Sequence, residues 1–365
     1  MNQNFYLKRL LELKDNFSVK VIAGACGVGK STLLKAFAEH LSAEGVDHAE
    51  IIHITCAADG RLKSYRDLYG LVAERTADLE RFFLLVDDVD RVAESEKTIN
   101  ALFAGEPAEI YVTTSSGVLV EKISALLPDN CDVLKIYPPP FDGTEDDLQR
   151  YLRFGSLPVT SGVDENILPR ILRGAAYEML FDIAEKNPAV DAGLIRVAAS
   201  FLAQSVGKPV NFKGAGENNL RKLKLSLHAV TDSGLFVKVP RLDVKSGNVL
   251  GGGDKFYCVD NGILRALAPT IDEAATIENA VCVELLRRGF EVFSGKCGAM
   301  NITFAATRGN GTIFIQVFSD MSVRRATRPL RALPDDAETL LIARNLVKSF
   351  GDVKAVTLRD FLLNV

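Results

Sequence analysis

The stretch VIAGACGVGKSTLLKAF, residues 21–37, leads from an apolar segment through a glycine-rich turn into a helical pattern. Within it, GACGVGKS fits the spacing G-x-x-x-x-G-K-[ST], with Gly24 and Gly29 followed by Lys30 and Ser31. Glycines let such a turn direct successive backbone N–H groups at phosphate oxygens, and the N-terminus of the next helix adds its positive end. The stretch therefore predicts a nucleotide-binding P-loop after a buried strand.

The expected chemistry of this loop assigns roles to its residues. Lys30 would neutralise the β- and γ-phosphates, and the Ser31 hydroxyl would be a ligand of Mg²⁺. The predicted cofactors are thus ATP and Mg²⁺. The predicted nucleotide-binding residues are Gly24, Ala25, Cys26, Gly27, Val28, Gly29, Lys30, Ser31 and Thr32. We interpret Cys26 as a small residue that fills a loop position rather than as a redox switch.

A second segment, RFFLLVDDVD at residues 81–90, is an apolar strand pattern that ends in acids, as in a Walker B motif. Asp87 is predicted to hold the Mg²⁺ shell, directly or through water. Asp88 is a candidate for polarising the attacking water, although it could instead cap the following helix, with Asp90 as a rival cap. Asp88 is one methylene shorter than glutamate, so weak hydrolysis is expected without loss of binding.

Polar residues also end the next strand pattern, YVTTSS at residues 111–116. A group that senses the γ-phosphate would lie there, and Thr113, Thr114 and Ser115 are candidates. Ordinary capping of the strand end is an equally good reading. Together with Asp88, Thr113 and Ser115 complete the predicted catalytic set.

Around these motifs, short apolar runs alternate with helical patterns from residue 21 to about residue 137. Such alternation predicts an α/β fold: the open parallel sheet of a P-loop NTPase with helices on both faces. The prolines of YPPPFDG, residues 137–143, end this pattern. The chain has 365 residues, so two or three domains are expected.

Composition and charge argue against several classes of protein and binding partner. The formal net charge is -4, which gives no general reason to expect nucleic acid or an anionic membrane. No apolar run reaches the length of a membrane span, and the charged N-terminal segment lacks the apolar core of a signal peptide. Six scattered cysteines without a CxxC pair argue against zinc and against a disulfide framework. A cytoplasmic protein is expected.

The rest of the chain predicts three further parts. Residues 142–189 are helical and would form a lid. Residues 190–262 show helices, a short turn at NFKGAG (211–216) and two strands joined across the glycine-rich SGNVLGGG (246–253), the order of a winged helix-turn-helix. Residues 263–365 are mixed α/β. The ATPase core would thus be residues 1–141.

Four segments resemble a known family. YLRFGSLP (151–158), KFYCVDNGILRAL (255–267), IENAVCVELLRRGFEV (277–292) and DFLLN (360–364) resemble motifs of bacterial and archaeal AAA+-like ATPases that are related to the STAND ATPases. The resemblance covers nearly the whole chain. It implies the order ATPase core, helical lid, winged helix and a C-terminal domain of unknown function related to PD-(D/E)xK nucleases.

The departures from that family bear on activity. The Walker B end reads Asp87-Asp88, as in STAND ATPases, and PDNCDVLKIYPPPF (128–141) lacks the arginine that the family carries there. In the last domain, Asn301, Thr303, Gln316 and Phe318 stand where the family would place the acids and lysine of a nuclease. Glu278 and Glu284 alone cannot assemble a metal site. The resemblance thus implies an inactive nuclease fold.

Two functions follow from these motifs. The first is an ATP-binding molecular switch with slow hydrolysis, in which the bound nucleotide sets the orientation of the later domains. The second is a nucleic-acid-binding regulator, with weak DNA binding through the winged helix and ATP as a structural ligand. For the second, Asn219, Arg221, Lys222 and Lys224 would have to be exposed together. A protein partner or self-association stays open, and no membrane partner is expected.

Overall fold

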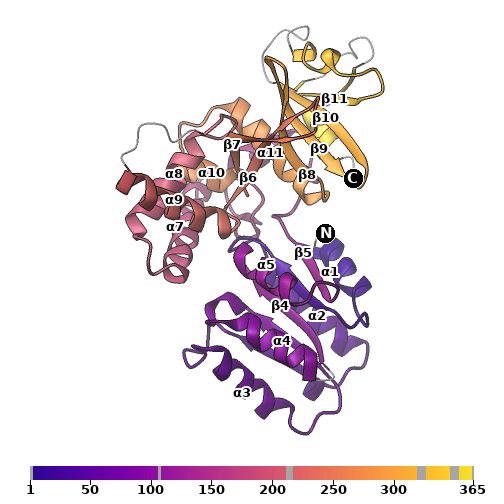
Figure 1. The fold of residues 1–365 in the computed structure, drawn as a ribbon, viewed down its shortest axis with the longest axis vertical. Coiled ribbons are helices and arrows are strands. Elements are labelled where there is room, and N and C mark those ends of the chain that lie inside the picture. Colours follow the sequence, from indigo (N-terminus) through magenta and orange to yellow (C-terminus); the bar gives the residue numbers. More distant parts are fainter. Residues whose placement is uncertain (1–2, 106–107, 211–216, 319–325, 346–352, 364–365) are drawn as a thin grey trace. The chain divides into compact units, whose positions relative to one another are not determined.

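The computed structural model describes residues 3–105, 108–210, 217–318, 326–345 and 353–363 (Figure 1). By its contacts the chain forms two compact units. The first unit comprises the residues up to Pro139 together with Glu185–Asn187 and Asp232–Gly234. The second unit comprises Pro140–Ala184, Pro188–Thr231 and the residues from Leu235 onward.

The first unit contains a five-stranded sheet in the order β2-β3-β4-β1-β5, in which every pair is parallel. This confirms the predicted α/β class. The strands are β1 (Val19–Ala23), β2 (Ile51–Thr55), β3 (Phe82–Asp87), β4 (Ala108–Thr114) and β5 (Cys131–Lys135). The helices are α1 (Gln3–Glu12), α2 (Lys30–Ala43), α3 (Tyr65–Thr76), α4 (Ser95–Gly105) and α5 (Gly117–Leu126), with the short helices η1 (His48–Glu50) and η2 (Val89–Arg91).

Alternate residues of these strands face two helical layers. One set, which includes Val21, Leu84 and Val112, packs in a single core with residues of α3, α4 and α5. The other face meets α2, where the rings of Phe37 and Tyr111 have centroids 4.4 Å apart. Because both faces are covered, most residues of β1, β3 and β4 are apolar and buried, which explains the apolar runs of the sequence.

The second unit is built on a seven-stranded mixed sheet in the order β12-β11-β10-β9-β8-β6-β7. Its strands are β6 (Phe236–Asp243), β7 (Val249–Cys258), β8 (Glu291–Cys297), β9 (Met300–Arg308), β10 (Gly311–Phe318), β11 (Glu338–Ala343) and β12 (Lys354–Thr357). Its helices are α6 (Glu145–Phe154), α7 (Leu168–Lys186), α8 (Ala192–Gln204), α9 (Glu217–Asp232), α10 (Asn261–Leu267), α11 (Glu273–Arg287) and α13 (Leu358–Leu363), with η3 (Pro158–Thr160) and η4 (Leu330–Ala332). No helix in the described residues is long and apolar enough to cross a membrane.

Residues 168–186 form one helix, α7, because the buried stripe of Leu168, Leu172, Ala176 and Met179 continues past Gly174. One local expectation is wrong. The glycine-rich segment 251–253 belongs to strand β7 rather than to the loop between the strands.

The β6–β7 connection is instead a tight turn over residues 244–248. The Asp243 carboxylate accepts hydrogen bonds from the backbone N–H groups of Lys245 and Ser246, and Gly247 adopts φ 72°. Strand β6 also pairs in parallel with β8, with Arg241 opposite Ser294, so the β6–β7 hairpin shares one sheet with the strands after residue 290. The division at residues 262/263 stays a prediction, and the predicted turn at 211–216 lies outside the described residues.

Residues of the segments 151–158, 255–267 and 277–292 contact one another in the interior of the second unit. The Asp260 carboxylate accepts hydrogen bonds from the N–H groups of Gly262 and Ile263 at the start of α10, and from the N–H of Ser156 after α6. A Cβ at Gly155 would lie 2.1 Å from that carboxylate. Asn279 accepts from the N–H of Cys258 and donates to its carbonyl. These motif residues therefore have structural partners.

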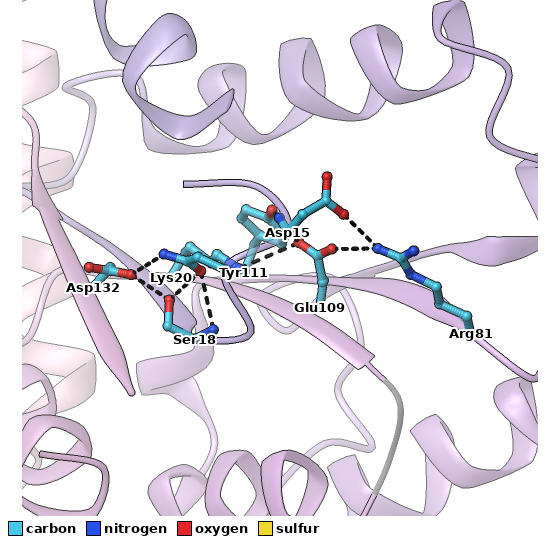
Figure 2. Close-up of polar contacts among 8 residues, drawn as sticks. Asp15, Ser18, Lys20, Arg81, Glu109, Tyr111 and Asp132 are labelled. Atoms are coloured by element: carbon cyan, nitrogen blue, oxygen red, sulfur yellow. Dashed lines mark hydrogen bonds and ion pairs between the residues drawn. The ribbon is translucent and has the colours of Figure 1, made fainter. Parts of the chain in front are cut away.

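A charged network lies at the amino ends of the strands in the first unit (Figure 2). The ammonium of Lys20 on β1 lies 3.4 Å from the Glu109 carboxylate on β4, and both side chains are buried. Glu109 also accepts hydrogen bonds from Arg81, from the Tyr111 hydroxyl and from the backbone N–H of Asp15. Burial lowers the pKa of Lys20, and the charge of Glu109 opposes that effect.

Candidate nucleotide-binding site

The predicted P-loop connects β1 to α2 and has the conformation that its glycines allow. The N–H of Gly24 donates to the carbonyl of Thr114 at 3.1 Å, and a Cβ at Gly24 would lie 2.6 Å from the Ile136 carbonyl oxygen. Gly27 and Gly29 have φ values of 77° and 110°, a region that other residues rarely adopt. The loop therefore requires glycine at all three positions.

Lys30 begins helix α2 and is buried, with 5% of its surface exposed. Its ammonium donates to the carbonyl of Ala25 at 3.0 Å, so the side chain folds back along the loop. Burial lowers the pKa of Lys30, and the negative charge of Asp88 opposes this. A lysine held in this way presents its charge to the space that the loop surrounds. Ser31 follows it, and its hydroxyl makes no hydrogen bond to any residue that the structure describes.

The two acids of the Walker B segment differ in their surroundings. Asp87 ends β3, is buried, and accepts a 2.6 Å hydrogen bond from the Thr113 hydroxyl on β4. The same hydroxyl accepts from the backbone N–H of Asp88 at 2.8 Å. Thr113 thus fixes the carboxylate of one acid and the backbone of the next. The structure brings Asp87, Asp88 and Thr113 together.

Asp88 has left-handed backbone angles, φ 54° and ψ 48°, and its side chain makes no capping hydrogen bond to η2. A non-glycine residue in this region costs of order 1 kcal/mol, and such strain concentrates at functional sites. Burial raises the pKa of Asp88, while Lys30 opposes that shift. The alternative role as a helix cap is therefore not adopted by Asp88.

Asp90 does not cap η2 with its side chain either. Its carboxylate accepts hydrogen bonds from the N–H and the hydroxyl of Ser115, and it pairs with the ammonium of Lys186 at 3.0 Å. Lys186 also donates to the Ser115 hydroxyl at 2.7 Å. Ser115 thus forms hydrogen bonds with both Asp90 and Lys186. The Thr114 hydroxyl accepts a hydrogen bond from the backbone N–H of Ser116 at the strand end.

Sequence reasoning missed Lys186. It ends α7, far along the chain, but segment Glu185–Asn187 belongs to the first unit. Burial lowers the pKa of Lys30 and the Lys186 charge adds to that effect; burial raises the pKa of Asp88 and the Lys186 charge opposes that effect. Burial alone would raise the pKa of Asp90, but the adjacent Lys186 ammonium brings it below its usual range. The only sequence signal is a basic residue at a helix C-terminus.

A second distant segment, Asp232–Gly234, also belongs to the first unit. The Asp232 carboxylate accepts from the backbone N–H of Val118 and from the Ser116 hydroxyl, both at the start of α5. A Cβ added to Gly234, which has φ 73°, would lie 3.3 Å from the backbone nitrogen of Ala25 in the P-loop. This segment therefore lies directly beside the phosphate-binding loop, and no motif in the sequence indicates it.

The nuclease-like positions of the second unit have other partners. Asn301 is exposed, the N–H of Thr303 donates to the side-chain oxygen of Gln316, and Glu278 accepts from Lys255 and Tyr257. Glu284 pairs with Arg287 and Arg288. Within the described ranges, no group of three or more histidines, cysteines or acids could hold a metal ion.

Part of the chain is similar to a known protein family. Residues 16–143 match the family described as AAA domain. An uncharacterized protein of Haemophilus influenzae is 27% identical over 389 aligned positions, which cover 98% of this chain and 97% of the relative.

Among solved structures, the Thermotoga maritima RuvB Holliday junction branch migration motor aligns with 66% of this chain and 90% of its own, at 15% identity and a TM-score of 0.32. A DNA polymerase III gamma subunit-related protein of the same organism aligns with 78% and 85%, at 13% identity and a TM-score of 0.30. The residues that match the AAA domain family, 16–143, include the P-loop and both strand-end motifs.

Proposed function

We propose that this chain binds ATP with Mg²⁺ at the P-loop and acts as a nucleotide-dependent switch that hydrolyses ATP slowly. The observation that carries the proposal is the pairing of a glycine-dependent loop around Lys30 with an Asp87 carboxylate held by Thr113. A lysine and backbone N–H groups bind phosphates, and a hydroxyl with one carboxylate and phosphate oxygens suits Mg²⁺. Ser31 and Asp87 are the proposed metal ligands.

The switch is supported by the two distant segments at the site. Lys186 pairs with Asp90 beside the phosphate-binding loop, and the γ-phosphate of a bound ATP would compete with Asp90 for this ammonium. Lys186 is the last residue of α7, and Gly234 follows α9. A change at these residues is passed into helices that continue in the second unit. We propose that this is how nucleotide occupancy reaches the rest of the chain.

Slow hydrolysis is supported by two features of the first unit. Asp88 is a methylene short for reaching a water in line with the γ-phosphate, and a misplacement of about 1 Å can cost roughly a hundredfold in rate. Segment 128–141 contains no arginine to stabilise the developing charge, and such a group contributes on the order of 10³ or more in related chemistry. Both deficits act on the transition state, so affinity for ATP is retained while turnover falls below about one per second.

A nucleotide titration by calorimetry, run beside steady-state phosphate release on the same sample, tests this proposal. Lys30→Ala should abolish measurable ATP binding because it removes the charge that meets the phosphates. Lys35→Ala is the matched control, since Lys35 is an exposed lysine on the same helix. Unchanged ATP affinity in Lys30→Ala, or equal losses in both variants, would contradict the assignment.

We also propose that the last part of the chain does not cleave nucleic acid. This is supported by Asn301 and Thr303 in place of acids and by Glu278 held by Lys255 and Tyr257. Incubation of plasmid DNA with Mg²⁺ or Mn²⁺ should leave it intact. Cleavage that disappears in Glu278→Ala would refute this part of the proposal.

The chain is proposed to work in the cytoplasm, where its six free cysteines would stay reduced.

The second candidate function is a nucleic-acid-binding regulator. Arg221, Lys222 and Lys224 on α9 are exposed together, as this function requires, whereas the side chains of Asn219 and Leu220 lie outside those described. Each phosphate contact contributes about one unit to the slope of log affinity against log salt. Arg221→Ala with Lys222→Ala should flatten that slope for duplex DNA by about two units. The control pair is Arg170→Ala with Arg173→Ala on α7. Equal slopes in the parent and in the α9 variant would show that α9 does not contact DNA.

A further inference from the structure

The second unit contains a cavity of about 590 Å³ that the nucleotide site does not use. Its wall is formed by α6, by Glu165 in the loop before α7, by the start of α11, by α10 and by the residue that follows β11. The wall is dominated by charge. Its arginines are Arg150, Arg153, Arg265 and Arg344.

Two of these arginines already have carboxylate partners. Arg150 lies 3.7 Å from Glu165, and Arg344 pairs with Glu273. The third acid of the wall, Asp146, forms no ion pair with a residue that the structure describes. Glu165 and Glu273 are therefore each associated with one arginine of the wall.

Arg153 and Arg265 are different, because neither forms an ion pair with any described acid. Arg153 is exposed and its guanidinium lies over the ring of Phe154, 4.9 Å from its centroid. Arg265 is half-buried, and its hydrogen bonds to the Leu152 carbonyl and the Thr276 hydroxyl are long, at 3.5 and 3.4 Å. Two like charges thus line one cavity, and neither has an ion-pair partner among the described residues.

The charge of Arg153 also acts on the guanidinium of Arg265. Burial lowers the pKa of Arg265, and the charge of Arg153 lowers it further. An anion placed between the two groups would remove this repulsion and supply acceptors for donors that now make only weak hydrogen bonds.

We propose that this cavity binds a small phosphate-bearing anion of nucleotide size through Arg153 and Arg265. The planar guanidinium matches two phosphate oxygens at once, which a lysine cannot do. The cavity volume lies within the range of about 300–1,000 Å³ that is typical of small-molecule sites. The acids of the wall can accept hydrogen bonds from hydroxyl or amino groups of the same ligand. This site is separate from the P-loop and does not depend on the proposed switch.

Calorimetry with inorganic pyrophosphate tests the proposal in full-length Lys30→Ala protein, in which the P-loop no longer competes for the probe. We expect saturable binding of one pyrophosphate per chain. Arg153→Ala, a change at an exposed side chain, should weaken it about tenfold or more, as loss of a charge-assisted contact does. Arg265→Gln should weaken it similarly, with Arg265→Lys retaining part of the affinity. Arg196→Ala, an exposed arginine on α8, is the matched control and should bind like its parent.

Three results would overturn the proposal. The first is no saturable binding of pyrophosphate. The second is an affinity unchanged by Arg153→Ala, or lowered equally by Arg196→Ala. The third is a short single-stranded oligonucleotide that binds more tightly than pyrophosphate with the same dependence on Arg153, because the cavity would then serve nucleic-acid phosphates. Each outcome is independent of ATP binding in the protein with an intact Lys30, so failure here leaves the proposed function standing.

Discussion

Replacing Lys186 with methionine should destabilise the ends of β3 and β4 at neutral pH. The Asp90 side chain is 3% exposed and lies 3.0 Å from the Lys186 ammonium. Without that ammonium, Asp90 keeps only the N–H and hydroxyl of Ser115, and its Oδ1 accepts no hydrogen bond from the described residues. Removing one member of a buried ion pair costs roughly 3–5 kcal/mol. Since Lys186 is 13% exposed and Ser115 remains, we expect about 3 kcal/mol, the lower end of that range.

The destabilisation should depend on pH in a defined direction. In the parent, Lys186 outweighs burial and lowers the pKa of Asp90, so its contribution to stability is complete above the unfolded pKa of about 3.9 and is lost as pH falls through the folded value. In Lys186→Met, burial dominates and raises the pKa of Asp90. That carboxyl then stabilises the fold while protonated and loses the contribution as pH rises. The difference between parent and variant should therefore grow from about pH 4 to pH 7.

Hydrogen exchange followed by mass spectrometry suits this test, because the chain has no tryptophan and exchange localises the effect. Peptides that cover β3 and β4 should show the loss of protection, and the free energy of local opening should fall more at pH 7 than at pH 5. Lys186→Met combined with Asp90→Asn should recover most of it, since the buried charge is gone. Lys35→Met is the control for an exposed lysine. A pH-independent loss, or a double variant no better than the single one, would refute the reasoning.

Three further predictions concern the same unit. Asp88→Glu should raise the rate of phosphate release and Asp88→Asn should abolish it with ATP affinity unchanged; no response to either change would mean that another residue positions the water. Thr113→Val removes the donor to Asp87, so it should weaken ATP binding about tenfold with Mg²⁺ but little without it, as measured by calorimetry; equal losses would indicate a structural role only. Glu109→Leu leaves the Lys20 ammonium buried without the Glu109 carboxylate and should lower the free energy of local opening in β1 and β4 by roughly 3–5 kcal/mol. Lys20→Met should lower it by only about 1 kcal/mol, because Glu109 retains its hydrogen bonds from Arg81, Tyr111 and the Asp15 N–H. A larger loss of exchange protection in Lys20→Met than in Glu109→Leu would contradict this reasoning.

The parts of the site that depend on local sequence could be predicted from it. A P-loop needs glycines and a lysine at fixed spacing, and Asp87 follows a buried strand, so both are visible in a few consecutive residues. The closeness of Thr113 to Asp87 also follows, because neighbouring parallel strands end at the same edge of a sheet.

Lys186 and Gly234 could not be predicted, since their positions depend on how helices distant in sequence return to the first unit. The hydrophobic pattern of the sequence does not indicate which distant helix ends contact the first unit. The glycines of 251–253 were misleading for a different reason: glycine is common in turns, but Asp243 supplies the turn instead, and β7 accommodates Gly252 and Gly253 at φ 77° and 69° within the strand.

The Lys20–Glu109 pair has a consequence for how the chain finds its sheet. Apart from Lys20 and Glu109, strands β1, β3 and β4 are short and mainly apolar, so hydrophobicity alone would be compatible with several strand orders and registers. In the native register Lys20 lies opposite Tyr111 on β4, which brings its ammonium to Glu109. A slip of β1 along β4 would separate the buried ammonium from the buried Glu109 carboxylate. The pair thus penalises misassembled sheets, and it selects the strand order that places the end of β1, and with it the P-loop, beside Thr114.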